Sequence, residues 1–137
     1  MKKALNIFIM AIALSTTLTM VSAQISNSKL IIGKWKFSGL SASYPPTMTG
    51  DELAQRKIKV AAQATKLEGQ SAEFLPGGSL NLAGRKLGWK MDATGKQFKI
   101  MKYLITVSVA KILELSVHKL VFTRLSDGIP ATYTLTR

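Results

Sequence analysis

Residues 30–39 read LIIGKWKFSG, a pattern typical of the first strand of a β-sheet. Apolar and basic residues alternate within it, which places Trp35 and Phe37 on one face of a β-strand and Lys34 and Lys36 on the other. A strand with one dry and one wet face is typical of a curved antiparallel sheet. Because Trp35 is a large aromatic side chain at the first inward position, we expect it to plug one end of the space that the sheet encloses.

The same alternation returns after Gly69, where short apolar segments are separated by turn sequences. The turns PGG (76–78), DATGK (92–96) and SDGIP (126–130) suit tight hairpins, which join antiparallel neighbours. The expected strands cover residues 33–38, 71–75, 79–83, 87–91, 97–101, 103–115, 119–125 and 131–136. We therefore predict an all-β fold, an antiparallel up-and-down barrel of about eight strands with one helix between the first and second strands.

The helix is predicted at residues 51–68. It follows the capping-box spacing Thr49-x-x-Glu52 and precedes Gly69, which suits a left-handed end cap. Its apolar positions recur at helical spacing and share one face: Leu53, Val60, Ala64 and Leu67. We expect this face to pack against the side or the mouth of the barrel.

Each predicted strand is apolar on one parity only, which assigns the inward-facing residues. These are Trp35, Phe37, Ala72, Phe74, Leu80, Leu82, Leu87, Trp89, Met91, Phe98, Ile100, Ile105, Val107, Val109, Leu120, Phe122, Tyr133 and Leu135. The long strand at 103–115 is the exception, because the same parity puts Lys111 inside after Val109. Either a bulge resets the register there, which is the commoner arrangement, or Lys111 lines the interior.

The start of the chain predicts export. Two lysines precede an apolar run at residues 4–14, and the segment ends in the small-residue cleavage site Val21-Ser22-Ala23. Serine and threonine interrupt the segment, which favours a signal peptide over a membrane anchor. We expect residues 1–23 to be the signal peptide and residues 24–137 to form one periplasmic or extracellular domain. The sequence has no cysteine, so we expect neither disulfides nor a lipid-modified cysteine that would tether the protein.

The formal net charge of the sequence is +12, to which Lys2 and Lys3 contribute. Such an excess suits an acidic partner, for example anionic lipid headgroups or a polyanionic glycan. The expected export argues against nucleic acid as a partner. Because the lysines are spread along the chain at outward strand positions, a generally basic surface is the simpler interpretation.

Residues that carry chemistry are few. The seven carboxylates fall mostly at helix ends or in turns, and His118 is the only histidine. The sequence shows no acid–base pair, no nucleophile beside a base, and no cluster with the spacing of metal ligands. We expect a non-catalytic protein without a metal or cofactor.

Four segments resemble one family. Gly33-x-Trp35 resembles the opening of lipocalin-like domains, and FLPGGSL (74–80) is similar to a hairpin of the small lipocalin-like domains of secreted Bacteroidetes proteins. GWKMDATGKQFKI (88–100) resembles their central hairpin, and LVFTRLSDGIPATYTLTR (120–137) their closing one. The resemblance covers most of residues 30–137, and the helix with the proline loop before it is the least similar part.

The resemblance implies how the barrel is closed. In lipocalins the tryptophan of the first strand closes one end, and a basic residue near the end of the last strand stacks across it. Arg137 shares the parity of Leu135 and would carry this role here, with Arg124 as the rival. A guanidinium over an indole face contributes about 0.5–2 kcal/mol, depending on burial.

Three kinds of function remain. The first is the binding of a small apolar ligand in or at the mouth of the barrel, with Trp89, Met91, Phe98 and Lys111 as candidate contacts. The second is a protein-binding envelope module or inhibitor with a filled barrel, and the third is a basic binder of anionic envelope lipid or glycan. Strands of about five to seven residues reach only about 17–23 Å, so we expect at most a shallow pocket.

Overall fold

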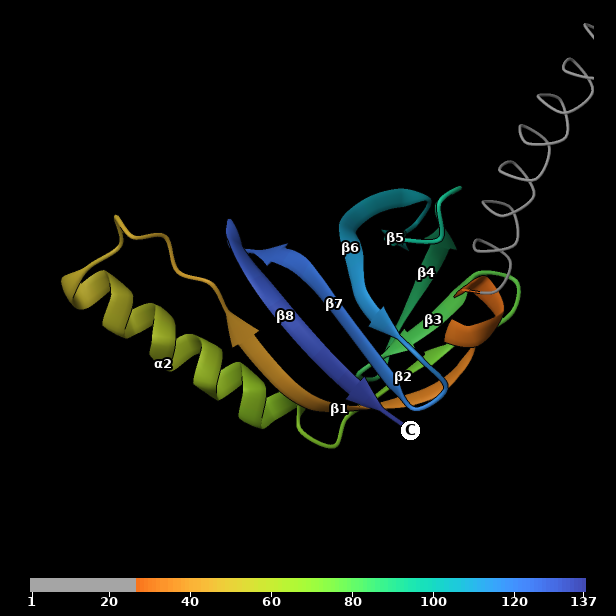
Figure 1. Ribbon diagram of the computed structural model, residues 1–137, viewed down its shortest axis with the longest axis horizontal. Coiled ribbons are helices and arrows are strands. Elements are labelled where there is room, and N and C mark those ends of the chain that lie inside the picture. Colours follow the sequence, from red (N-terminus) through yellow and green to blue (C-terminus); the bar gives the residue numbers. More distant parts are fainter. Residues whose placement is uncertain (1–26) are drawn as a thin grey trace, which may run out of the picture.

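The computed structural model describes residues 27–137 and shows a closed barrel (Figure 1). Eight antiparallel strands pair with their neighbours in sequence, and the first strand closes the ring against the last. The strands are β1 (Gly33–Ala42), β2 (Ser71–Phe74), β3 (Ser79–Leu82), β4 (Arg85–Met91), β5 (Gln97–Lys102), β6 (Ile105–Leu115), β7 (Lys119–Ser126) and β8 (Ile129–Thr136), and the helix α2 (Gly50–Leu67) separates β1 from β2. The predicted fold class is confirmed. The predicted signal peptide lies outside the described residues.

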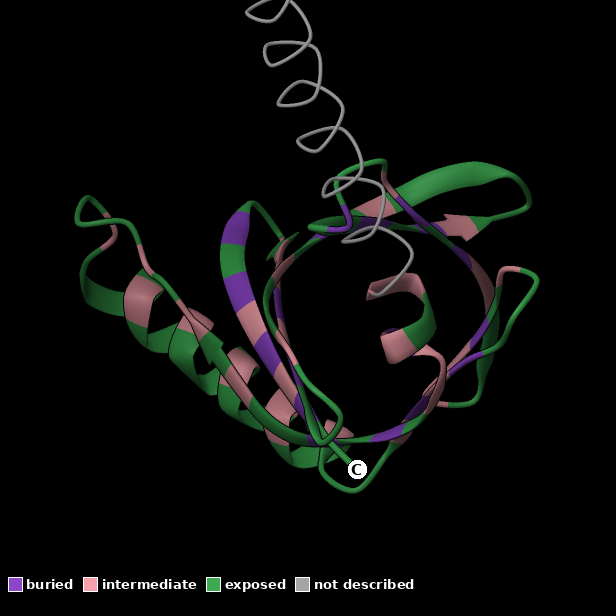
Figure 2. Cartoon of the chain, turned by 45° about the vertical axis from the view of Figure 1, so that its right-hand side comes forward, coloured by how far each residue is buried: buried purple, intermediate pink, exposed green. Residues whose placement is uncertain are grey.

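The core is the inside of the barrel, where buried residues alternate with exposed ones along the strands (Figure 2). A series of aromatic rings runs through it. Phe74 meets Phe98 edge to face, Phe98 meets Phe122 in the same way, and Phe122 stacks on Tyr133, with ring centroids 5.5, 5.3 and 5.1 Å apart. Such pairs add to the stabilisation that burial alone provides. Outside β6, every residue predicted to point inward is buried or half-buried.

Strand β6 has the opposite register from the one predicted. Its inward positions hold the small side chains of Ser108 and Ala110, which lie opposite Ile100 and Phe98 of β5. The apolar residues expected inside, Ile105, Val107 and Val109, are instead exposed. The sequence pattern was misleading because small side chains fill the interior where they lie opposite large ones. The inward face of β6 is therefore less hydrophobic than its outward face.

Lys111 therefore lies on the outside of the barrel, and the prediction that it could line the interior is wrong. Two register shifts do occur in this strand, one at Val107, between Thr106 and Ser108, and one between Ile112 and Glu114. Both Ile112 and Leu115 are half-buried and pack against the core, so the extra residue between them changes the parity of β6.

Helix α2 lies outside the barrel, alongside β1 (Figure 1). The predicted apolar face is half-buried, namely Leu53, Val60, Ala64 and Leu67, and no residue of this helix is fully buried. Thr49 is the residue before the first turn but its side chain makes no capping hydrogen bond, so the predicted capping box is wrong. Gly69 has φ +75°, the left-handed conformation expected just after a helix, but its N–H donates to the carbonyl of Phe37 in β1 at 3.3 Å rather than to the helix. Within residues 27–137 no helix is long and apolar enough to cross a bilayer.

Asp92 is one of the few acidic residues, and it lies in the turn between β4 and β5. Partial burial of Asp92 opposes its ionisation, but hydrogen bonds from the Thr94 hydroxyl and from the N–H groups of Gln97, Lys96 and Gly95 outweigh it and lower the pKa of the carboxyl. The Thr94 hydroxyl donates at 2.9 Å and the Gln97 N–H at 3.3 Å. This carboxylate serves to order the turn.

Candidate functional site

One end of the barrel is closed by Trp35. Its side chain is fully buried, and its indole N–H donates to the carbonyl of Ile31 at 2.8 Å. Ile31 is also fully buried and ends the short helical stretch 27–31, which lies across the opening of the barrel in Figure 2. The indole and this stretch together lie at the end of the barrel at which β1 begins.

Arg137 is the basic residue that stacks on Trp35. Its guanidinium carbon lies 3.9 Å from the centroid of the indole. The same group donates to the carbonyls of Val117 at 2.7 Å, Ile32 at 2.9 Å and Leu30 at 2.7 Å. The rival, Arg124, lies over Tyr133 instead, at 5.1 Å. Arg137 thus ties the last residue of the chain to the segment before β1.

Gly33 makes room for this arrangement. Its φ is +129°, a conformation that residues with a side chain rarely adopt. A Cβ at this position would lie 2.8 Å from a terminal nitrogen of Arg137. The glycine of the Gly-x-Trp motif is therefore needed both for its backbone angle and for the close approach of the arginine.

Replacing Arg137 with alanine is expected to lower the free energy of unfolding by about 1–3 kcal/mol, because a partly exposed stack and three hydrogen bonds are lost. Arg137→Lys keeps the charge but not the planar fork, so most of the loss should remain. Urea denaturation measures both. The control is Arg85→Ala, which removes an arginine at the start of β4, away from Trp35. It is expected to change the free energy of unfolding by less than about 0.5 kcal/mol. Equal losses in Arg137→Ala and Arg85→Ala would contradict this account.

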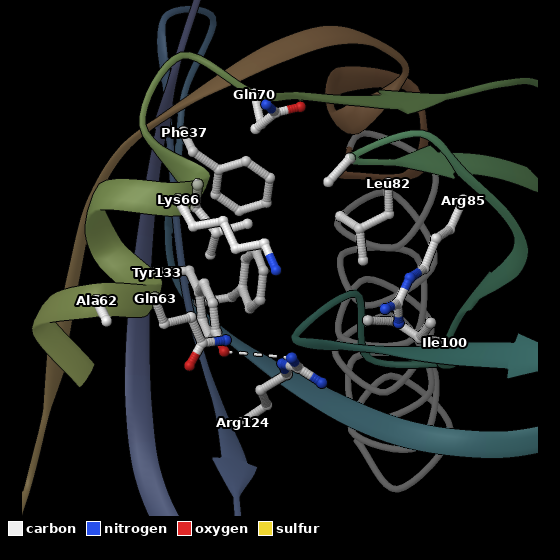
Figure 3. A pocket seen from close by; sticks show the side chains of 13 residues that line it. Phe37, Ala62, Gln63, Lys66, Gln70, Leu82, Arg85, Ile100, Arg124 and Tyr133 are labelled. Carbon is white, nitrogen blue, oxygen red and sulfur yellow. Dashed lines mark hydrogen bonds between the residues drawn. The ribbon is translucent and has the colours of Figure 1, made fainter. Parts of the chain in front are cut away.

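The other end of the barrel holds a cavity of about 610 Å³ (Figure 3). Its floor is apolar and consists of the side chains of Phe37, Leu82, Ile100, Phe122 and Tyr133. Residues from the last turns of α2 form one wall, and the turn between β3 and β4 forms another. The cavity opens to solvent and its volume falls within the usual range for small-molecule sites. It exceeds the shallow pocket expected from the sequence, because the last turns of α2 and the turn between β3 and β4 form walls around it.

Three cationic side chains surround this cavity. Lys66 comes from α2, Arg85 from the start of β4 and Arg124 from β7, and Figure 3 shows their charged ends directed towards the same space. Arg124 is held in place by Tyr133, whose hydroxyl accepts from one of its terminal nitrogens at 3.2 Å. Among the described residues no aspartate or glutamate lines the cavity. The mouth is therefore an apolar cavity with a purely positive rim.

The residues predicted as ligand contacts lie elsewhere. Met91 and Phe98 are buried in the core below the cavity, and Lys111 is on the outer surface. Trp89 is also buried, and its indole N–H donates to the carbonyl of Leu75 at 3.0 Å. None of these four residues belongs to the cavity lining in the part of the chain that the structure describes.

Sequence reasoning missed the cationic rim. Arg124 shares the inward parity of Phe122, and this was the one available signal for a charged residue inside the barrel. Lys66 is not among the apolar positions of the predicted helix, and Arg85 lies between two predicted strands rather than in one. Their convergence depends on how the last turns of α2 lie beside the mouth, which has no sequence signal.

Comparisons with known proteins give no match to a family model, to a curated protein or to a solved structure. The site must therefore be judged on its geometry. Between residues 27 and 137 there is no group of three histidine, aspartate or glutamate side chains that could hold a metal ion. What the described chain presents is a closed β-barrel with one plugged end and one open, cationic end.

Proposed function

We propose that this is a lipocalin-like, non-catalytic binding protein, exported after removal of residues 1–23, whose mouth cavity takes a small amphipathic anion. The single observation that carries the proposal is the purely positive rim over an apolar floor. An apolar ligand tail gains from leaving water for the floor of Phe37, Ile100 and Phe122. A carboxylate or similar head group gains from the arginines at the rim.

The two arginines are well suited to a carboxylate. A guanidinium presents paired N–H donors that match the two carboxylate oxygens, and such charge-assisted hydrogen bonds are stronger than neutral ones. Arg124 is already oriented by Tyr133, so less conformational entropy is lost when the ligand binds. Without a ligand, the like charges of Arg85, Arg124 and Lys66 face one solvent-filled space, so an anion there also relieves their repulsion.

This arrangement favours a ligand carrier over a protein-binding module with a filled barrel. The plugged half of the interior is filled by the aromatic series, but the open half leaves about 610 Å³. A protein partner would not require a concave cavity with converging charges.

Isothermal titration calorimetry with dodecanoate and with dodecanol, its uncharged analogue, tests the proposal. We expect dodecanoate to bind at least about tenfold more tightly than dodecanol, since the head group makes charge-assisted hydrogen bonds. Arg85→Ala and Arg124→Ala should each weaken dodecanoate binding by about tenfold or more and leave dodecanol binding nearly unchanged.

The matched control is Lys86→Ala. Lys86 follows Arg85 in β4, is exposed and does not line the cavity. It removes the same charge from the neighbouring position and should not change the affinity for dodecanoate. Equal affinities for the acid and the alcohol, or equal effects of Arg85→Ala and Lys86→Ala, would reject the anion site.

A further inference from the structure

The hairpin between β5 and β6 has an unusual tip. Lys102 pairs with Ile105, so Tyr103 and Leu104 alone form the turn. Both have positive φ, 52° and 66°, as a two-residue hairpin turn of this kind requires. Asparagine and glycine are the residues that adopt these angles readily, whereas large side chains are strained there. The turn therefore keeps two residues that its backbone geometry disfavours.

The side chains at this tip are not used for packing. Tyr103 is 87% exposed and Leu104 is 97% exposed. Their presence is thus unfavourable on two counts, backbone strain and exposure of apolar surface to water, and neither is compensated by contacts with the core. Strain retained at an exposed site indicates a function for the side chains themselves.

Exposed apolar side chains continue from the tip along β6. Ile105, Val107, Val109 and Leu113 are all about half exposed or more. Val109 lies on the outer face of the strand, opposite Lys99, and Val107 is the extra residue at the register shift beside it. We call the tip and these side chains the apolar strip, comprising Tyr103, Leu104, Ile105, Val107, Val109 and Leu113. Exposed apolar side chains gathered in this way mark an interaction surface.

Lysines border the apolar strip. Lys99 of β5 pairs with Val109 and also with Lys90 of β4, so two lysines lie in a row beside the strip. Lys102 precedes the tip and Lys111 interrupts the outer face of β6. Of the acids in these strands and their turns, Glu114 lies at the far end of β6, where Lys119 pairs with it at 3.4 Å, and Asp92 orders the β4–β5 turn.

We propose that the β5–β6 hairpin docks on a membrane surface rich in anionic phospholipid, with Leu104 entering the acyl region and Tyr103 lying at the level of the head groups. Tyrosine favours that interface because its ring is apolar and its hydroxyl is polar. The bordering lysines lie where lipid phosphates would be, and their long stems let the charge reach the head groups. An exposed two-residue tip with lysines beside it suits insertion between lipids, whereas protein interfaces are generally broader and bury aromatic anchors in pockets.

The docking does not depend on the cavity being a ligand site, so the two proposals can fail separately. In an up-and-down barrel alternate turns lie at the same end, so the β5–β6 tip shares an end with the β3–β4 turn, which borders the cavity. Docking would therefore bring the open end of the barrel towards the lipid surface.

Vesicle co-sedimentation tests the proposal, with vesicles of phosphatidylcholine alone and of phosphatidylcholine mixed with phosphatidylglycerol. We expect binding to the mixed vesicles, weakened about tenfold or more when the salt concentration is raised from about 0.1 to 0.5 M, because exposed charges are then screened. The double variant Tyr103→Asn with Leu104→Gly should lose this binding by about tenfold or more. Since asparagine and glycine suit the turn, its thermal midpoint should be equal to or higher than that of the parent protein.

Two controls separate the hairpin from general surface properties. Leu125→Asn changes another exposed leucine, on β7 and outside the apolar strip, and should leave vesicle binding unchanged. Lys99→Gln with Lys102→Gln should weaken binding to mixed vesicles, whereas Lys57→Gln with Lys59→Gln on α2 should have a smaller effect. All variants carry the same N-terminal residues, so differences between them report the substituted positions.

Equal binding of the parent and the Tyr103→Asn, Leu104→Gly variant would overturn the proposal. So would equal binding to neutral and anionic vesicles. Binding to neither kind of vesicle would reject the membrane as the occupant and leave the apolar strip as a surface for a protein partner.

Discussion

Replacing Trp35 with alanine is expected to lower the free energy of unfolding by about 3–5 kcal/mol, the usual range for truncating a fully buried large aromatic residue. The indole is fully buried at the closed end of the barrel. The substitution leaves a void there, removes the donor to the carbonyl of Ile31 and takes away the surface on which Arg137 stacks. Few other single positions combine these three losses. Urea or guanidinium denaturation followed by circular dichroism measures the effect.

Trp35→Phe is the informative companion to this variant. Phenylalanine keeps an aromatic ring over which the guanidinium can lie but cannot donate to the carbonyl of Ile31, so a smaller loss of about 1–3 kcal/mol is expected. A loss below about 1 kcal/mol for Trp35→Ala would show that the indole does not close the barrel in the way described.

Phe98→Ala is expected to have an effect of the same size, about 3–5 kcal/mol. Phe98 is fully buried and stands in the middle of the aromatic series, in edge-to-face contact with both Phe74 and Phe122. Its removal interrupts the series and leaves a void that the rigid barrel wall cannot easily collapse into. The measurement is again chemical denaturation, with thermal unfolding as a check.

This variant also distinguishes a core residue from a ligand contact. Sequence reasoning assigned Phe98 to the ligand site, whereas the structure places it below the cavity, among buried rings. We therefore expect Phe98→Leu, which keeps most of the volume, to bind dodecanoate with unchanged affinity while losing stability. If Phe98→Leu loses as much affinity for dodecanoate as Arg85→Ala does, Phe98 is part of the ligand site.

The barrel could be predicted because its local signals agree with one another. Alternation in GKWKF (33–37) defined the first strand, and glycine-containing turns defined the hairpins. Short hairpins leave only a meander of neighbouring strands, and a meander of eight strands can bury its inner face by closing on itself. The pairing of β1 with β8 followed from that requirement and from no single motif.

Two features could not be predicted, for different physical reasons. The register of β6 was misassigned because hydrophobic alternation assumes that the more apolar face points inward, and here Ser108 and Ala110 fill the interior beside bulky neighbours. The cationic rim depends on where the last turns of α2 lie beside the mouth, a tertiary arrangement that brings Lys66 near Arg85 and Arg124. Strand parity alone indicated only one of these three residues.

The stacking of Arg137 on Trp35 has a consequence for the order of folding. The hydrogen bond from Arg137 to Ile32 joins residues separated by 105 positions, and β8 supplies one side of the seam that closes the ring. Neither the seal nor the ring can form until β8 and Arg137 are present. Contacts this distant in sequence generally slow folding, because much chain entropy is lost before they form. The hairpins from β2 to β7 can assemble earlier, and the final, cooperative step is then the joining of β1 to β8.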